Sequence, residues 1–115
     1  MNKYIIIFTA MMAISITSFS QNKDIQIDTV FVQGNCNMCK TRIENAAYIN
    51  GVKRADWDKH SHKLVVTYRP SKVSKKDIEK SIASVGHDTE NMKADTSDYK
   101  KLPKCCSYRE HNHAH

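Results

Sequence analysis

The first half of the chain shows a strand pattern followed by a helix pattern. Apolar and polar residues alternate from residue 25 and run together to residue 32, as in a strand with one buried face. A helix is expected to begin between Asn37 and Cys39 and to stop at Asn50-Gly51, because glycine favours a left-handed C-terminal cap. Its apolar positions recur at helical spacing: Ile43, Ala46 and Ala47. This half therefore predicts one β-α unit.

The second half shows two more strands, a second helix and a short final segment. Residues 52–58 and 63–68 alternate in the manner of a β-hairpin. Ser74 can cap a helix whose apolar face ends just before Gly86. Residues 87–92 are poorly patterned and are expected to form at best an edge strand. The order β-α-β-β-α-β predicts an α+β, ferredoxin-like fold, with a four-stranded antiparallel sheet and both helices on one face.

The two ends of the chain differ in composition from this domain, which spans residues 21–93. Residues 1–20 combine a basic start, an apolar run and small residues at the end, the pattern of a secretory signal peptide cleaved after Ser20. An uncleaved membrane anchor is the alternative. Cleavage predicts an exported protein, periplasmic or secreted, without a stable membrane span. Residues 94–115 form a polar tail rich in cysteine and histidine, which begins with a linker at residues 94–101.

Charge and residue content exclude several functions. Basic residues outnumber acidic ones, 18 to 12, but the two signs are interspersed, which indicates a solvated surface. RNA-recognition domains share the β-α-β-β-α-β order, but they stack bases on aromatic residues of a central strand, and residues 63–68 lack that signature. No nucleic-acid partner is therefore expected. An enzyme is not expected either, because no serine–histidine–aspartate set, phosphate loop or carboxylate pair stands out.

Two of the four cysteines, Cys36 and Cys39, form a C-x-x-C pair where the first strand meets the first helix. Unpaired N–H groups and the positive end of the helix dipole favour thiolates at such a position. Thiolates bind soft ions such as Cu(I), and two ligands leave room for ligand exchange with a partner. The spacing alone also fits a redox pair, half of a zinc site, or cysteines in long-range disulfides. An extracytoplasmic thiol-disulfide oxidoreductase is therefore the rival function, although neither proline lies where a thioredoxin-type fold needs one.

Further residues give this pattern a family resemblance. They are Cys36-Asn37-Met38-Cys39, Ile43-Glu44 in the first helix, Gly51-Val52 at the second strand, and Val85-Gly86-His87 after the second helix. Over residues 25–93 the chain resembles the heavy-metal-associated domain family, which includes copper chaperones, N-terminal domains of metal-pumping ATPases and periplasmic mercury-binding proteins. The resemblance implies a small carrier that holds one soft ion between Cys36 and Cys39. Cu(I) is the expected ion, with Hg(II), Zn(II) and Cd(II) as alternatives, and a metal transporter or another metal carrier is the expected partner.

Three more residues are candidate metal ligands. His87 stands where many relatives have an aromatic residue and some bacterial copper carriers have a histidine. It can supply a third ligand, screen the site or lie in solvent. Cys105 and Cys106 are adjacent, and one of them can complete the primary site if the tail folds back and Leu102-Pro103 docks on the domain. They can instead form a vicinal disulfide, remain disordered or bind a second ion with the tail histidines. Those histidines are His111, His113 and His115.

Overall fold

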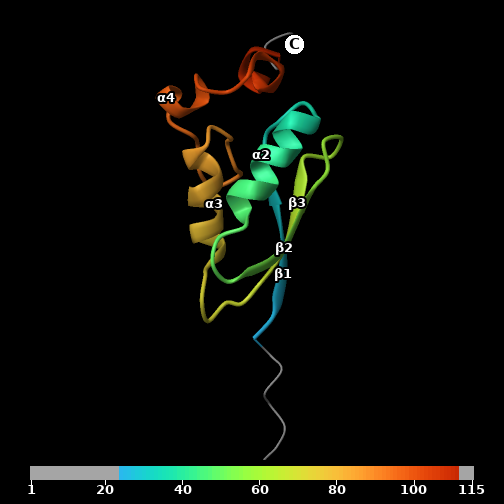
Figure 1. The fold of residues 1–115 in the computed structure, drawn as a ribbon, viewed down its shortest axis with the longest axis vertical. Coiled ribbons are helices and arrows are strands. Elements are labelled where there is room, and N and C mark those ends of the chain that lie inside the picture. The colour runs from blue at the N-terminus through green and yellow to red at the C-terminus, as the bar shows by residue number, and fades with distance from the viewer. Residues whose placement is uncertain (1–23, 112–115) are drawn as a thin grey trace, which may run out of the picture.

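The computed structural model describes residues 24–111, apart from the side chain of His111. The signal peptide predicted at residues 1–20 and the histidines His113 and His115 lie outside the described residues. The elements follow one another as β1, α2, β2, β3, α3, α4, η2 and α5 (Figure 1). Their bounds are Gln26–Phe31, Asn37–Ala47, Val52–Trp57, Lys63–Tyr68, Lys75–Ser84, Thr96–Tyr99, the 3-10 turn Lys104–Cys106, and Tyr108–His111.

The strands form an antiparallel sheet in the order β1-β3-β2. β3 lies in the centre, where Leu64 pairs with Val30 of β1 and with Trp57 of β2, so the predicted hairpin is confirmed. All three side chains are buried, whereas the residues on either side of Leu64 and Trp57 in the sequence are exposed. One face of the sheet therefore carries the core, as the alternation of residues predicts.

α2 and α3 pack on this buried face of the sheet (Figure 1). α3 begins with the expected capping box, in which Asp77 N–H donates to Ser74 Oγ at 3.0 Å and Ser74 N–H donates to Asp77 Oδ2 at 3.1 Å. Arg42 of α2 donates to the Val85 carbonyl, just after α3, at 3.1 Å. The first turns of α2 and the loop after α3 therefore lie at the same end of the molecule.

The fourth strand of the expected sheet is not formed within residues 24–111. Residues 87–92 contribute a single antiparallel bridge, from Thr89 to Val32, beside β1. The chain then turns back, because Thr89 N–H donates to the Met92 carbonyl at 2.7 Å and Thr89 Oγ1 donates to Glu79 of α3 at 2.8 Å. The prediction of four strands and two helices is therefore wrong in this part: the described chain has three strands and four α-helices in an α+β arrangement.

The C-terminal segment belongs to the folded core. Residues 94–101, expected to be a linker, contain α4 and bury Tyr99. Leu102 and Tyr108 are buried in the same apolar cluster as the sheet and the two long helices. In Figure 1 this segment, coloured orange to red, lies at the end of the molecule where α2 begins. Within residues 24–111, no helix has the length and apolar character that a membrane span requires.

Candidate metal centre

The first two cysteines lie at the start of α2. Cys36 is the N-cap residue, with an extended backbone, and its carbonyl accepts a hydrogen bond from Lys40 N–H at 3.1 Å. Cys39 follows in the first helical turn, and the two Sγ atoms are 3.4 Å apart. Cys39 is fully buried and Cys36 is partly exposed. The two sulfurs therefore converge on one point, with one of them open to solvent, at the N-terminus of a helix.

The loop before α2 is held in place by close packing on Trp57. A Cβ atom at Gly34 would lie 2.9 Å from the Trp57 ring and 3.0 Å from Cys39 Cβ, so a larger residue would push the loop outward. Trp57 Nε1–H donates to the Val32 carbonyl at 3.0 Å. Asn35 N–H points at Cys39 Sγ from 3.4 Å. Trp57 therefore packs beneath the loop and helps to position the two cysteines.

Cys105 and Cys106 lie against the same pair, because the tail folds back onto the domain. Cys36 Sγ is 3.3 Å from Cys105 Sγ and 3.6 Å from Cys106 Sγ. The sulfurs of Cys36, Cys39 and Cys106 all lie within 4.8 Å of one another. Cys106 is fully buried, whereas Cys105 is exposed, with its Sγ 3.8 Å from the Met38 thioether sulfur. The described cysteines are free thiols, and they gather four soft donor atoms in one place.

Three of these thiols differ in acidity. Burial raises the pKa of Cys36, but hydrogen bonds with the Cys39 N–H and with the neighbouring thiols outweigh burial and lower that pKa to about 7. Burial, together with hydrogen bonds to Cys39 and Cys36, raises the pKa of Cys106. The hydrogen bond between the Cys105 and Cys36 thiols raises the pKa of Cys105. Of these three thiols, Cys36 is therefore the one that ionises near neutral pH.

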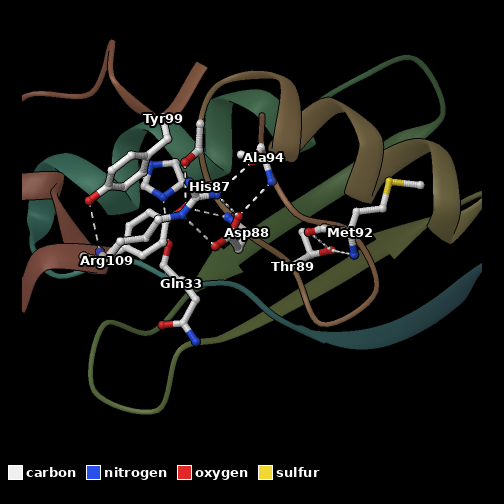
Figure 2. A network of polar contacts seen from close by, with 10 residues as sticks. Gln33, His87, Asp88, Thr89, Met92, Ala94, Tyr99 and Arg109 are labelled. Atoms are coloured by element: carbon white, nitrogen blue, oxygen red, sulfur yellow. Dashed lines mark hydrogen bonds and ion pairs between the residues drawn. The ribbon is translucent and has the colours of Figure 1, made fainter. Parts of the chain in front are cut away.

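His87 is not part of this group of sulfurs. It contacts Gln33, in the loop that leads to Cys36 (Figure 2). Its side chain is fully buried, and Nδ1 donates to the Gln33 carbonyl at 2.7 Å, since a carbonyl oxygen can only accept. Burial, the largest effect, and the charge of Arg42 lower the pKa of His87, which favours the neutral ring. Nε2 then carries a lone pair, for which no hydrogen-bond partner is found in residues 24–111. The contacts show a positioning role for His87, and its role as a metal ligand stays a prediction.

Three residues that the sequence patterns did not single out, Asp88, Tyr108 and Arg109, fasten the tail beside His87. Tyr108 Oη donates to the Gly86 carbonyl at 2.7 Å and accepts from Asp88 N–H at 2.8 Å. Arg109 forms an ion pair with the Asp88 carboxylate, at a closest N–O distance of 2.7 Å. The rings of His87 and Tyr108 stack with their centroids 5.6 Å apart. One sequence signal of a folded tail is its spaced large apolar residues, Tyr99, Leu102 and Tyr108.

The combination of fold and donor atoms defines a class of protein. A strand that leads through a C-x-x-C loop into a helix, in an antiparallel sheet covered by two helices on one face, is a small metal-binding scaffold. Its donors are sulfur atoms, which favour soft ions such as Cu(I) and Zn(II) over hard ones such as Mg(II). The side chains of His111, His113 and His115 lie outside the described part of the chain, so their part in metal binding stays a prediction.

Solved structures of known proteins share this scaffold. One is a CopZ metallochaperone, whose sequence is 30% identical to this chain. The match covers 56% of this chain and 98% of the CopZ chain, with a TM-score of 0.54. Another is a copper-binding domain of HMA7, a P-type ATPase, which is 29% identical to this chain. The match covers 56% of this chain and 89% of the HMA7 domain, also with a TM-score of 0.54. A third is oxidized MerP from Ralstonia metallidurans CH34, which is 26% identical to this chain. The match covers 57% of this chain and 94% of the MerP chain, with a TM-score of 0.54.

The likeness covers nearly the whole length of the CopZ chain at 30% identity, and the paired cysteines of the site fit it. The chain therefore belongs to the heavy-metal-associated domain family. Neither a family model nor a curated protein sequence matches the chain. Family membership thus rests on the solved structures and on the geometry of Cys36 and Cys39.

Proposed function

We propose that the protein captures a soft metal ion outside the cytoplasm, and that it buffers the ion or carries it to a partner. The observation that carries this proposal is the 3.4 Å separation of the Cys36 and Cys39 sulfurs at the start of α2. A pKa of about 7 for Cys36 supports it, because the thiolate, and not the thiol, is the metal ligand. The donor atoms belong to elements packed into the core, which keeps them together before the ion arrives.

Cu(I) is the ion that we propose. Low coordination numbers and thiolate ligands suit Cu(I), and one exposed side at Cys36 allows a second protein to attack the bound ion. The names of the similar CopZ metallochaperone and of the P-type ATPase domain refer to metal or copper handling, which supports a transporter or another metal carrier as the partner. Hg(II), Zn(II) and Cd(II) share the preference for sulfur and remain the competing cargo ions.

Carriage of an ion breaks and forms metal–sulfur bonds only, so the proposed protein is not an enzyme. The rival, a thiol-disulfide oxidoreductase, would use the same Cys36–Cys39 pair to reduce substrates catalytically. The insulin-reduction assay separates the two functions. We expect Cu(I) uptake at a fixed stoichiometry and no catalytic turbidity, whereas turnover of insulin disulfides would support the rival.

The proposed site is tested by native mass spectrometry of reduced protein titrated with Cu(I). We expect wild type to retain one ion and the Cys36→Ser/Cys39→Ser variant to retain none. A matched control, Cys105→Ser/Cys106→Ser, removes the same number of thiols and should still take up the ion. Loss of the ion in the control, with retention in the Cys36→Ser/Cys39→Ser variant, would place the primary site in the tail instead.

Export is proposed from the amino-acid pattern of residues 1–20. Expression of the full chain with a C-terminal epitope, followed by cell fractionation and N-terminal sequencing, tests it. We expect a processed protein that starts at Gln21 in the extracytoplasmic fraction. Recovery of unprocessed chain in the cytoplasm would contradict the proposed compartment and would leave the metal site itself unaffected.

A further inference from the structure

Residues 94–111, called the arm below, meet the domain at two places. One is the sulfur cluster, where η2 places Cys106 against Cys36 and Cys39. The other is the loop after α3, where Tyr108 and Arg109 bind. The second contact, called the latch, contains no sulfur, so it can be weakened without removing a metal ligand.

The sulfur positions favour Cys106 over Cys105 as the atom that closes the site. Two sulfurs bound to one ion at about 2.3 Å lie roughly 3.7–4.0 Å apart in tetrahedral or trigonal coordination. Cys106 Sγ is 3.6 Å from Cys36 Sγ and within 4.8 Å of Cys39 Sγ, so shifts of a few tenths of an ångström to about one ångström would bring all three onto one ion. Cys105 Sγ is close to Cys36 but faces solvent beside Met38.

The latch combines the buried Tyr108 with an ion pair that is partly exposed. Arg109 and Asp88 keep 28% and 13% of their side-chain surface exposed, and α5 is a single turn of four residues. Arg109 also lies over the Tyr99 ring, with its guanidinium carbon 4.4 Å from the ring centroid, and donates to the Ala94 carbonyl at 2.8 Å. Such a segment can detach at a lower free energy than global unfolding, because it shares no strand and no long helix with the rest of the fold.

We propose, resting on the function proposed above, that the arm is a releasable closure of the metal site: it adds the Cys106 sulfur to an ion held by Cys36 and Cys39, and the latch must open before the ion leaves. The Cys106 thiol gives its proton to solvent when its sulfur binds the ion. The oxidation state of the ion does not change. When the latch opens, the metal–sulfur bond to Cys106 breaks, the thiolate takes up a proton, and a partner's sulfur can occupy the vacated position.

The first test measures release of Cu(I) from loaded protein to an excess of bathocuproine disulfonate. We expect Cys106→Ser to release the ion roughly tenfold faster than wild type or more, within the range that loss of a supporting group costs metal sites. Arg109→Gln should accelerate release to a similar extent, although it removes no sulfur. Lys101→Gln is the matched control, because it removes a positive charge from the same arm at a residue whose ion pair with Asp98 is long, 3.8 Å, and exposed. It should release the ion at the wild-type rate.

The double variant Arg109→Gln/Cys106→Ser shows whether the latch acts through Cys106. We expect it to release Cu(I) no faster than Cys106→Ser alone. Equal acceleration by Arg109→Gln with and without Cys106 would overturn the proposal, and so would a wild-type release rate in Cys106→Ser. If Arg109→Gln fails to fold, as judged by circular dichroism, Tyr108→Phe takes its place, since it removes only the hydroxyl that joins Gly86 and Asp88.

A second readout uses the metal-free protein under reducing conditions. Alkylation of Cys106 by iodoacetamide, followed residue by residue with mass spectrometry, reports opening of the arm. We expect the latch variants to be alkylated at Cys106 roughly tenfold faster than wild type, and Lys101→Gln to match wild type. If Cys106 were alkylated at the same rate in wild type, Lys101→Gln and both latch variants, Arg109→Gln and Tyr108→Phe, the proposed latch would be contradicted. Failure of wild type to hold Cu(I) at all would instead contradict the proposed function, so the two failures are distinguishable.

Discussion

At the scale of single residues, the buried His87 supports the loop that leads to Cys36. Its Nδ1–H donates to the Gln33 carbonyl, three residues before Cys36, and its ring stacks on Tyr108 of the arm. One side chain thus touches both the loop that carries the primary cysteines and the segment that carries Cys106. Protonation of this ring would place a charge in a buried position, which the fold disfavours.

The lowered pKa of His87 predicts a stability loss in mild acid. Because burial holds the folded-state pKa below the unfolded value of about 6.5, the unfolded chain binds more protons as pH falls through 6.5. The free energy of unfolding should therefore decrease below pH 6.5, with a slope approaching about 1.4 kcal/mol per pH unit for this one group. Urea unfolding of metal-free protein between pH 7.5 and 5 measures it. His87→Asn keeps an N–H donor for Gln33 and should abolish that slope, and an equal slope in both proteins would refute the assignment.

Single residues were predictable from sequence where a local pattern carries the chemistry. Cys36 and Cys39 could be predicted as a pair from their spacing and from their place at the start of a helix. His87 was a candidate because some relatives in the resembling family have a histidine at that position. Its stacking on Tyr108, which lies 21 residues further along the chain, could not be predicted from the local pattern. For Cys105 and Cys106, spacing alone left four outcomes open: a closed site, a second site, a vicinal disulfide and a disordered tail.

At the scale of elements, the turn after α3 limits where the arm can lie. Gly86 has a φ of +104°, and a Cβ atom there would lie 2.8 Å from the Asp98 carbonyl oxygen and 3.1 Å from the Leu102 side chain. Both contacts belong to the arm. Gly51, after α2, has a similar φ of +101°, but a Cβ atom there would meet Val73 within the domain.

Gly86→Ala and Gly51→Ala should therefore destabilise the protein similarly but differ at the metal site. A left-handed conformation costs an alanine about 1–2 kcal/mol, so both variants should melt at lower temperature. Gly86→Ala should also speed alkylation of Cys106, because its methyl group displaces the arm, whereas Gly51→Ala should leave that rate close to wild type. Thermal melts and mass-spectrometric alkylation check the pair. The same alkylation rate in both variants would show that Gly86 does not set the position of the arm.

Most of the elements could be predicted from periodicity, apart from the final strand and the helices of the C-terminal segment. The hairpin at Trp57 and Leu64 and the capping box at Ser74 follow from local patterns, and both are present. The final strand is reduced to one bridge because Thr89 bonds to Glu79 and Asp88 binds Arg109. Those partners lie 10 and 21 residues away, so no window of sequence around residues 87–92 could show them.

At the scale of the whole molecule, the arm and the domain share one apolar core. Tyr99, Leu102, Cys106 and Tyr108 pack into the same cluster as the sheet and the two long helices. A small domain gains little stability from its core alone, so each added buried side chain matters. The alternation of polar and charged residues after Lys93 concealed this, since it resembles a linker until the contacts across the fold are known.

Metal binding should stabilise this whole unit, and the size of the effect reports how many sulfurs hold the ion. A ligand that binds only the folded state stabilises it by about 2.7 kcal/mol when its free concentration is 100 times the dissociation constant. For a domain of this size that shift amounts to roughly 10–20 °C in melting temperature. We expect this shift for wild type in Cu(I) buffered at that concentration, and its reversal when a chelator removes the ion.

At the same free Cu(I), Cys106→Ser should show about half of this stabilisation, because a tenfold weaker site loses about 1.4 kcal/mol. Cys36→Ser/Cys39→Ser should show none, since no pair of sulfurs then remains at the start of α2. Differential scanning calorimetry under reductant measures all three proteins. A full shift in Cys36→Ser/Cys39→Ser would mean that the ion stabilises the fold from another place. A full shift in Cys106→Ser would mean that the two sulfurs of α2 hold it without the arm, so that the arm's burial in the core serves stability alone.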